Sequence, residues 1–467
     1  MGSLLKDLRY ALRGLLRTPA LSMVLITTLA LGIGANTALF SVVKSVLLAP
    51  LPYEQPDRVV MLWSRWKDFP DRTWVGAEEY QNYTRVLKRL SSLALIQGFE
   101  VSITDGDQPL RVSSYSTTPN LFQTLGVSAA AGRTFAPGDA VSGSEDVVIL
   151  TYDLWQSRFA GDAGVIGRKL SVNGEPQTIV GVLPQGFKLP LDYKTASPAQ
   201  LFFPLVLPPF DGVVPQFGGS HGYYAVGRLA PGATVQSAND ELRQLVARMT
   251  QDGVYTREFN FGAFVISAPD EVAGKLRTAL LVLLGAVGFV LLIACANVAS
   301  LLLVRAEERR REVSVRAALG ASRMRLIRQF LTENVLLSLT GGALGLLLAF
   351  LGVRALVALA PASLPRFPEV AVDAPVLIFT ALLAVLTAIL FGLLPALQGS
   401  RAELQETLKE SGRANTSSAR RTRVRQMLVV SQVALAVVLV MGAGLMLKSF
   451  TRLLAIDPGF AARNVLT

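Results

Sequence analysis

The residue types that build metal and nucleotide sites are scarce in this sequence. Histidine and cysteine occur once each, as His221 and Cys295, so there is no His/Cys cluster for zinc and no intrachain disulfide. The single Gly-Lys pair, Gly274-Lys275, is followed by Leu276 and lacks the G-x-x-x-x-G-K-[ST] loop that cradles phosphates. We therefore expect no catalytic residue, no bound metal and no cofactor in this chain.

One stretch has a pattern suited to binding another protein. The sequence EERRREVSVRAALGASRMRLIRQF, residues 307–330, carries the mostly apolar decapeptide VSVRAALGAS beyond a charged stem. Gly320 interrupts the pattern, and Ser322 can cap a new helix in which Met324, Ile327 and Phe330 share one face. A short apolar block raised on charges is typical of a docking surface, although the residues alone leave a lipid-facing elbow equally open.

The overall composition is that of a membrane protein. The 467 residues are 51% hydrophobic and only 17% charged, with a mean hydropathy of +0.43. Five uncharged runs reach the length of about 20 residues that a helix needs to cross a bilayer. The first run could be a cleaved signal peptide, but it exceeds the usual apolar length and no clear A-x-A site follows, which favours a retained anchor.

Basic residues predict the orientation of the chain. Residues 1–17, 305–333 and 401–425 together hold 19 Lys and Arg against 8 Asp and Glu, which accounts for the whole net charge of +11. Positively charged short segments stay in the cytoplasm, so we place these three inside, together with the N-terminus. The excess charge then needs no nucleic acid to explain it.

This orientation divides the sequence into ten segments. They are a cytoplasmic amphipathic helix (1–17), a first span (18–48), an extracytoplasmic domain (49–275), a second span (276–304), a cytoplasmic basic segment (305–333), a third span (334–358), a fourth span (374–400), a cytoplasmic linker (401–425), a fifth span (426–447) and the start of a second extracytoplasmic domain (448–467). The first helix can lie on the membrane lipids with its leucines down, or simply continue the first span.

The extracytoplasmic segment has the pattern of a folded α+β domain. Short β-rich runs at residues 58–63, 146–155, 177–184 and 223–232 end in Gly or Pro turns and predict strands. Residues 235–249 have helical periodicity, and Thr234 can cap their start. Residues 188–222, rich in Pro and Gly, predict a long loop between two subdomains. The fold class we expect is an α-helical transmembrane bundle that carries this domain.

The five uncharged runs at the centre of the predicted spans offer few groups for ion or proton chemistry. No Asp, Glu, His, Lys or Arg lies within the five uncharged runs, which argues against an ion-coupled transporter. Asn36, Asn297 and Gln432 can form hydrogen bonds between helices, and Gly341 with Gly345 forms a GxxxG face suited to close helix packing.

Several motifs resemble those of MacB/FtsX-like ABC transporter permeases. The stretch RRREVSVRAALGASRMRLIRQFLTENVLLSLTGGALGLLLA is similar to the region between the second and third spans of that family, and its R-E-x-x-x-R-x-A-L-G-A motif matches here as Arg311, Glu312, Arg316, Ala318, Leu319, Gly320 and Ala321. Fragments such as TTPNLFQTLGVSAAAGRTFAPGD and GRLAPGATVQSANDEL resemble the family's periplasmic domain. Their order along the chain carries the resemblance.

The resemblance implies a partner and a contact with it. Permeases of this family lack an ATP site, so a separate cytoplasmic ABC ATPase subunit is expected, and the cytoplasmic segment after the second span meets it. The residues that would couple to the ATPase are Glu312, Val313, Val315, Arg316, Leu319, Gly320 and Ala321. Apolar members would supply buried area, and Glu312 with Arg316 would set the register. A periplasmic adaptor is a further partner that the resemblance allows.

The end of the sequence resembles its beginning. KSVLLAPLPYEQPDRVVML follows the first span and KSFTRLLAIDPGFAARNVLT follows the fifth. We expect the sequence to be the N-terminal part of a duplicated, two-half (ADOP-like) permease, in which the fifth span begins a second repeat.

Two function classes remain open at this point. The resemblance implies a bacterial inner-membrane permease that couples ATP hydrolysis by its partner to export or extraction of a substrate, with the large two-part ectodomain favouring this choice. The alternative is an FtsX-like regulator that uses the same motion to activate an extracytoplasmic hydrolase.

Overall fold

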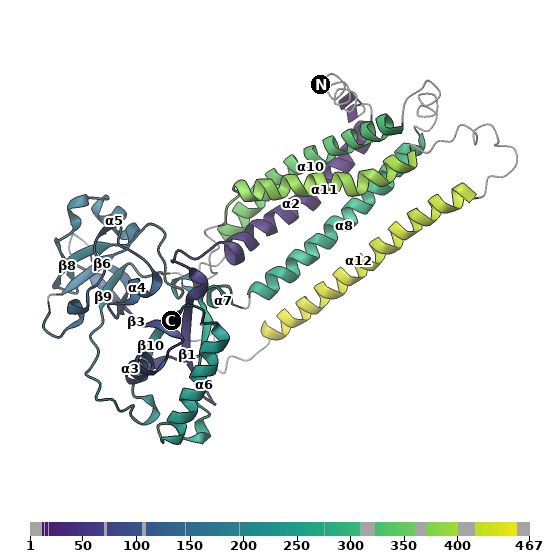
Figure 1. The fold of residues 1–467 in the computed structure, drawn as a ribbon. Coiled ribbons are helices and arrows are strands. Elements are labelled where there is room, and N and C mark those ends of the chain that lie inside the picture. The colour runs from purple at the N-terminus through teal and green to yellow at the C-terminus, as the bar shows by residue number, and fades with distance from the viewer. Residues whose placement is uncertain are drawn as a thin grey trace, which may run out of the picture. The chain divides into compact units, whose positions relative to one another are not determined.

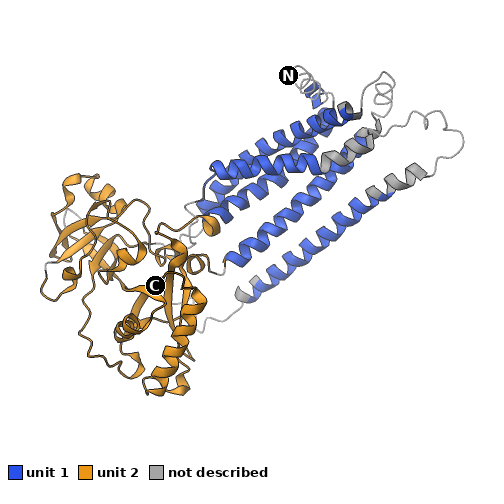
Figure 2. Cartoon of the chain, viewed as in Figure 1, with its two compact units in different colours: residues 1–45, 277–359, 368–467 blue, residues 46–276, 360–367 orange. Residues whose placement is uncertain are grey.

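The computed structural model describes residues 12–13, 15–16, 18–69, 72–104, 109–144, 146–195, 197–274, 276–308, 323–359, 370–399 and 416–454. The chain forms two compact units, coloured separately in Figure 2. Unit 1 comprises residues 1–45, 277–359 and 368–467, and unit 2 comprises residues 46–276 and 360–367. The predicted amphipathic helix at 1–17, the linker at 401–425 and the second domain start at 448–467 lie wholly or largely outside the described residues.

Unit 1 consists of long apolar helices (Figure 1). They are α2 (Pro19–Val43), α8 (Leu276–Glu308), α10 (Arg323–Leu359), α11 (Ala374–Gly399) and α12 (Thr416–Leu454). Among the described residues, four helices are long and apolar enough to cross a membrane, and α11 contributes a shorter apolar stretch, Ala374–Leu390. This agrees with the predicted layout of apolar spans around a large domain.

Helix α2 supplies the buried centre of unit 1. Its residues Leu25, Leu29 and Ile33 pack with Leu291 of α8 and Leu337 of α10. Small and polar residues make up much of the rest of its buried face, which allows neighbouring helices to come close. The π-helix η1 (Lys44–Leu48) continues α2 toward the ectodomain.

Unit 2 is built on one mixed sheet with the strand order β11-β1-β10-β3-β4-β9-β6-β8-β5. Strand β2 pairs with β10, and β7 pairs with β3 and β8. The strands are β1 (Val59–Arg65), β2 (Val75–Gly76), β3 (Leu90–Ile103), β4 (Leu110–Thr117), β5 (Ala131–Gly132), β6 (Val147–Leu150), β7 (Lys169–Val172), β8 (Glu175–Val182), β9 (Leu201–Pro204), β10 (His221–Leu229) and β11 (Gly262–Ser267).

Short helices cover this sheet. They are α3 (Ala77–Val86), α4 (Leu121–Leu125), α5 (Tyr152–Phe159), α6 (Val235–Gln251) and α7 (Ala268–Ala273), with 3₁₀ turns η2 (Pro56–Arg58), η3 (Pro137–Ala140), η4 (Ala163–Val165), η5 (Asp192–Lys194), η6 (Gln216–Gly218) and η7 (Arg257–Phe259). The predicted cap of α6 is present, since the Thr234 hydroxyl accepts a hydrogen bond from the Ser237 amide at 3.1 Å.

Strand β3 is shared by the two halves of the ectodomain. Its first half pairs with β10 from Leu90 to Ile96, and its second half pairs with β4 from Ile96 to Ile103. One core lies under the β10 half, together with α3 and α6. Another lies under β6, β7 and β8, together with α5. The two halves are therefore joined by continuous backbone and by a continuous hydrogen-bond ladder.

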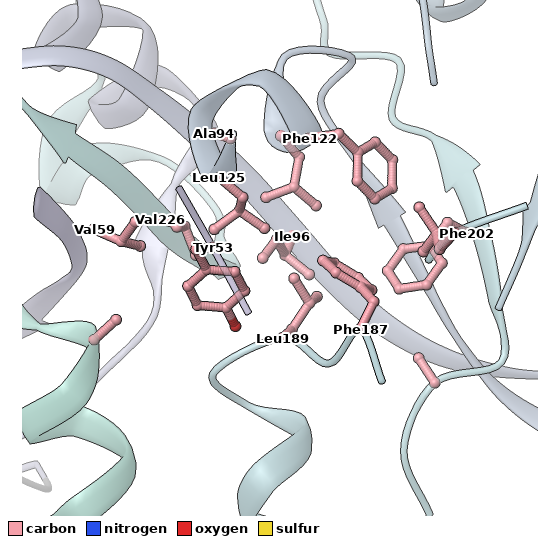
Figure 3. Packing of buried hydrophobic residues seen from close by; sticks show 14 of the residues in the cluster. Tyr53, Val59, Ala94, Ile96, Phe122, Leu125, Phe187, Leu189, Phe202 and Val226 are labelled. Carbon is pink, nitrogen blue, oxygen red and sulfur yellow. The ribbon is translucent and has the colours of Figure 1, made fainter. Parts of the chain in front are cut away.

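A third core joins these two halves. Phe122 of α4 contacts Phe187 and Phe202 with ring centroids 5.9 and 5.6 Å apart, and Phe187 and Phe202 are themselves 6.0 Å apart. Figure 3 shows these rings beside Ile96 of β3 and Leu189. Offset and edge-to-face aromatic contacts of this kind add stability beyond simple burial.

Two predictions in the ectodomain were wrong in part. The run 146–155 was expected to be one strand, but β6 ends at Leu150 and α5 begins at Tyr152, because the Thr151 hydroxyl accepts a hydrogen bond from the Leu154 amide and caps a helix there. The loop predicted at 188–222 contains β9, which pairs with β4 and β6. Its Pro204 lies at the strand end, where a missing amide is tolerated.

Candidate functional site in the helix bundle

The proposed ATPase contact lies outside the described residues. Glu312, Val313, Val315, Arg316, Leu319, Gly320 and Ala321 all fall between residue 308, where α8 ends, and residue 323, where α10 begins. Helix α10 begins inside the predicted basic segment, so the proposed contact directly precedes this helix along the chain.

Helix α10 packs on α2 with backbone against backbone. A Cβ atom added to Gly345 would lie 2.8 Å from the Ala30 carbonyl oxygen and 3.0 Å from the Gly34 amide nitrogen. One added to Gly34 would lie 2.7 Å from the Gly345 carbonyl oxygen, and one added to Gly341 would lie 2.8 Å from the Leu29 Cβ. Only glycine fits at this crossing. The structure thus places Gly341 and Gly345 on the α10 face that touches α2.

Helix α11 packs on the same helix further along. The rings of Phe40 in α2 and Phe379 in α11 are stacked, with centroids 4.0 Å apart and an interplanar angle of 7°. One helical turn earlier, the hydroxyls of Thr37 and Thr380 lie 3.0 Å apart and share a hydrogen bond. An aromatic stack and a hydroxyl pair at adjacent turns fix α11 against rotation about α2.

An ion pair closes the end of this helix contact. Lys44, the first residue of the π-helix η1, donates to the carboxylate of Asp373, whose carbonyl oxygen accepts from the Leu377 amide at the start of α11. The pair is partly exposed, so its contribution is about 0–1 kcal/mol. Its value is positional, because it holds the point at which α2 becomes η1.

Hydrogen bonds also connect α8 to its neighbours. The Asn36 side-chain amide donates to the Val287 carbonyl oxygen of α8 at 3.1 Å and to its own Gly32 carbonyl at 2.9 Å. The Gln432 amide of α12 donates to the Asn297 side-chain oxygen at 3.2 Å. All three amide residues singled out in the sequence therefore form contacts involving α8.

We call this set of contacts along α2 the α2 seam; it comprises Gly34, Asn36, Thr37, Phe40 and Lys44 with their partners. It contains no catalytic grouping, and no cluster of three or more metal-ligating side chains occurs among the described residues. Close backbone contact, ring stacking and hydrogen bonds are what a rigid joint requires. The seam thus holds α10 and α11 firmly against α2.

A buried charged cluster stiffens the ectodomain. The fully buried Glu79 carboxylate accepts from the Gly76 amide at 2.8 Å and from the Tyr255 hydroxyl, and lies 3.3 Å from His221 Nε2. The other ring nitrogen of His221 lies 3.1 Å from the Gly219 carbonyl oxygen. Burial lowers the pKa of His221, but pairing with Glu79 outweighs it, so the net pKa is raised above the ordinary value of 6.5.

Sequence reasoning missed several of these partners. Lys44 directly follows the first uncharged run and Asp373 directly precedes the fourth, and these positions were the available signal for the ion pair. His221 was used only to exclude zinc, and nothing in the local sequence connects it with Glu79. Gly34 was visible as a small residue in the first span, without any sign of which helix it meets.

Comparisons with known proteins match the two parts of the chain in order. A family model for the MacB-like periplasmic core domain matches residues 22–245, and a model for the FtsX-like permease C-terminal region matches residues 284–404. The first match begins in α2 and ends in α6. The second covers α8, the proposed ATPase contact, α10 and α11.

Individual relatives are distant. The uncharacterized ABC transporter permease YknZ of Bacillus subtilis is 27% identical over 282 residues, covering 60% of this chain and 65% of the relative. The pyoverdine export ATP-binding/permease protein PvdT of Pseudomonas savastanoi pv. phaseolicola is 27% identical over 273 residues, covering 58% of this chain and 39% of the relative. The chain thus spans less than two thirds of either relative.

A solved structure resembles the ectodomain only loosely. The periplasmic region of MacB from Actinobacillus actinomycetemcomitans is 14% identical with a TM-score of 0.33, covering 48% of this chain and 92% of that chain. The classification rests instead on the two family models, which match the ectodomain and the following helices in the order that the sequence motifs predicted. The chain belongs to the MacB/FtsX-like permeases.

Proposed function

We propose that this chain is the permease subunit of a MacB-type ABC transporter. Its task is to couple ATP hydrolysis by a separate cytoplasmic ATPase to movement of the ectodomain, for export or extraction of a substrate. The observation that carries the proposal is the continuous path from α10, which directly follows the proposed ATPase contact, across the Gly345–Gly34 crossing to α2 and η1.

The ATPase contact is assigned to residues 312–321. Val313, Val315, Leu319 and Ala321 would bury apolar area against the partner, while Glu312 and Arg316 would set the register through paired charges. Chemistry on ATP is assigned to the partner, because the chain's single Gly-Lys pair lies outside any phosphate-cradling loop.

The chain is placed in a bacterial inner membrane with its N-terminus in the cytoplasm. The three basic segments support this orientation through the positive-inside bias. The ectodomain then lies on the opposite side from the ATPase. A displacement must cross the membrane along helices, since the five uncharged runs contain no ionisable side chain that could serve as a proton relay.

Export is favoured over the regulator alternative by the names of the relatives. PvdT and the MacB of Chromobacterium violaceum are named as pyoverdine and macrolide export proteins, the latter 28% identical over 285 residues. The family also contains FtsX-like members, so an assay has to separate the two roles. Efflux from cells with and without the intact chain, measured beside extracytoplasmic hydrolase activity, does so.

Copurification tests the ATPase contact. The parent chain, Leu319→Asp and Gly320→Asp are each co-expressed with a candidate ABC ATPase subunit. Each chain is then purified in nanodiscs, and the amount of bound ATPase is measured. A charge placed in an apolar interface is left unpaired and desolvated, so we expect at least a tenfold loss of bound ATPase.

The matched control is Ala402→Asp, in the other cytoplasmic segment outside the proposed contact. It should leave the complex intact. If Leu319→Asp and Gly320→Asp retain the ATPase as well as this control does, the proposed contact is wrong. Monodisperse gel filtration of each variant separates loss of contact from loss of folding.

A further inference from the structure

An aromatic cavity lies at one end of the ectodomain sheet. Its volume is about 610 Å³, within the range of about 300–1,000 Å³ that is usual for small-molecule sites. The wall is mainly aromatic: Trp66, Phe69, Trp74, Phe217, Phe259 and the imidazole of His221. The proposed export function so far assigns no role to this cavity.

The rim of the aromatic cavity is exposed to an unusual degree for such large side chains. Phe69 is 62% exposed, Trp74 50%, Phe259 40% and Phe217 38%. A single exposed aromatic residue needs no explanation, but four of them around one concavity form a patch of the kind that binds ligands. Solvation of these rings is unfavourable, so the exposure calls for a function.

The floor of the aromatic cavity is held rigidly. Trp66 makes edge-to-face contacts with His221, Tyr255 and Phe261, at centroid distances of 5.4, 5.5 and 4.8 Å. His221 is fixed in turn by Glu79 and the Gly219 carbonyl. A preformed wall costs a ligand little ordering free energy on binding.

The rim also holds one residue in a strained conformation. Phe217 has φ 62° and ψ 20°, the left-handed region that aromatic residues rarely adopt. Gly218 and Gly219 follow with φ 77° and 82°, and a Cβ atom on Gly219 would lie 2.3 Å from a Glu78 carboxylate oxygen. Strain of this kind is retained where a particular side-chain position matters, and here it holds the Phe217 ring against Phe259 at 5.3 Å.

Charge at the aromatic cavity is already balanced within the protein. Arg72 forms hydrogen bonds of 2.6 and 2.8 Å to both carboxylate oxygens of the buried Glu271, and His221 is paired with Glu79. Neither side chain needs a ligand anion. The remaining recognition comes from ring faces and edges, which select a neutral aromatic group through stacked and edge-to-face contacts.

The aromatic cavity lies at the end of the sheet away from the chain's exits. Strands β1 and β11 pair from Val60 with Ser267 at one end to Arg65 with Gly262 at the other. The first pair is close in sequence to the segments leading to α2 and α8. The cavity residue Trp66 directly follows Arg65 in the chain, and the cavity residue Phe259 lies shortly before Gly262. Within the domain, the cavity and the two chain connections therefore lie at opposite ends of this strand pair.

We propose that the aromatic cavity binds a neutral small molecule through a planar aromatic group. This deepens the proposed export function by naming a chemical class for a substrate that the ectodomain receives. The binding step itself requires neither ATP nor the ATPase partner. If the cavity does not bind an aromatic molecule, the proposal for the ATPase contact is not contradicted. Conversely, Leu319→Asp should bind the aromatic probe as the parent chain does.

Fluorine NMR on the full chain in nanodiscs tests the proposal. The four tryptophans are labelled as 5-fluorotryptophan, and 2-naphthol is the probe, with its free concentration measured by dialysis against empty nanodiscs. Trp66 and Trp74 line the cavity, whereas Trp155 lies on α5. We expect the first two resonances to shift and saturate and the Trp155 resonance to stay in place. The aliphatic probe 1-octanol should bind about tenfold more weakly, because it lacks the ring contacts.

Two variants complete the test. Phe259→Ser removes a cavity ring and should weaken 2-naphthol binding at least tenfold. The matched control is Phe99→Ser, also 40% exposed but outside the cavity, which should bind as the parent chain does. An unchanged Trp155 resonance shows that each variant is folded. Unsaturable shifts, equal binding of 1-octanol, or equal binding by Phe259→Ser and the parent would each overturn the proposal.

Discussion

Substituting Gly345 by alanine tests the closest contact in the bundle. The added methyl group would lie 2.8 Å from the Ala30 carbonyl oxygen and 3.0 Å from the Gly34 amide nitrogen. Both are backbone atoms of α2, so neither can turn away as a side chain would. Restoring an ordinary contact requires α10 and α2 to move apart by several tenths of an ångström, which loosens the neighbouring contacts at Gly341 as well.

The magnitude follows from two opposing effects. Overpacking a tightly packed core costs about 1–3 kcal/mol, while replacing glycine by alanine within a helix gains up to about 1 kcal/mol from propensity. Gly352→Ala, on the same helix, should have the gain in helix propensity without the overpacking cost. Apart from the neighbouring backbone of α10 itself, no described atom lies within 4 Å of its added Cβ. The difference between the two variants isolates the overpacking cost, and amounts to a melting temperature about 2–12 °C lower for Gly345→Ala.

The chain contains its own reporter for this measurement. Cys295 is its single cysteine and is buried on α8 in the core that includes Leu29 and Ile33 of α2. A thiol-reactive fluorophore added during a thermal ramp in nanodiscs reports when this core opens. Equal melting temperatures for Gly345→Ala and Gly352→Ala would refute the backbone contact, and with it the path proposed from α10 to α2.

Two further predictions concern the ectodomain. Because the folded pKa of His221 is raised above 6.5, its stabilising contribution is complete below about pH 6.5 and is lost as the pH rises through the folded pKa. The melting temperature, followed by tryptophan fluorescence, should therefore fall more steeply from pH 6 to 8.5 in the parent chain than in His221→Gln. Parallel curves would contradict the pairing with Glu79. Thr234→Ala should lower the free energy of unfolding measured in urea by about 1 kcal/mol, because the α6 cap is lost. Thr256→Ala, at a 3₁₀ turn without a side-chain cap, should have little effect. Similar losses for both variants would argue against the cap.

The sequence was most informative where one physical requirement dominates. A span needs about 20 apolar residues whatever its neighbours are, and α2, α8, α10 and α12 follow directly from that requirement. The start of α6 was predictable because a Thr cap is a local interaction. The boundary between β6 and α5 was less so, because the Thr151 cap, which accepts one hydrogen bond from the Leu154 amide, begins a helix in residues that were expected to continue the strand.

Partners far apart in the sequence could not be predicted. The GxxxG pattern identified the α10 face but not Gly34 as the residue that it meets, since any helix with a small residue would satisfy the pattern. The pairing of Glu79 with His221 depends on where α3 and β10 lie in the folded domain. The aromatic cavity depends in addition on the left-handed backbone at Phe217, which has no clear signature in an aromatic residue.

The adjacency of β1 and β11 has a mechanical consequence. The two strands pair antiparallel. The polypeptide therefore enters β1 and leaves β11 at the same end of the strand pair, where Val60 faces Ser267. Pulling those two ends apart would unzip the pair one hydrogen bond at a time, the weakest way to load a sheet. Moving them in concert puts no separating force on these bonds, so the domain can move as a rigid body. For the proposed coupling of ATP hydrolysis to the ectodomain, we therefore expect α2 and α8 to move in step.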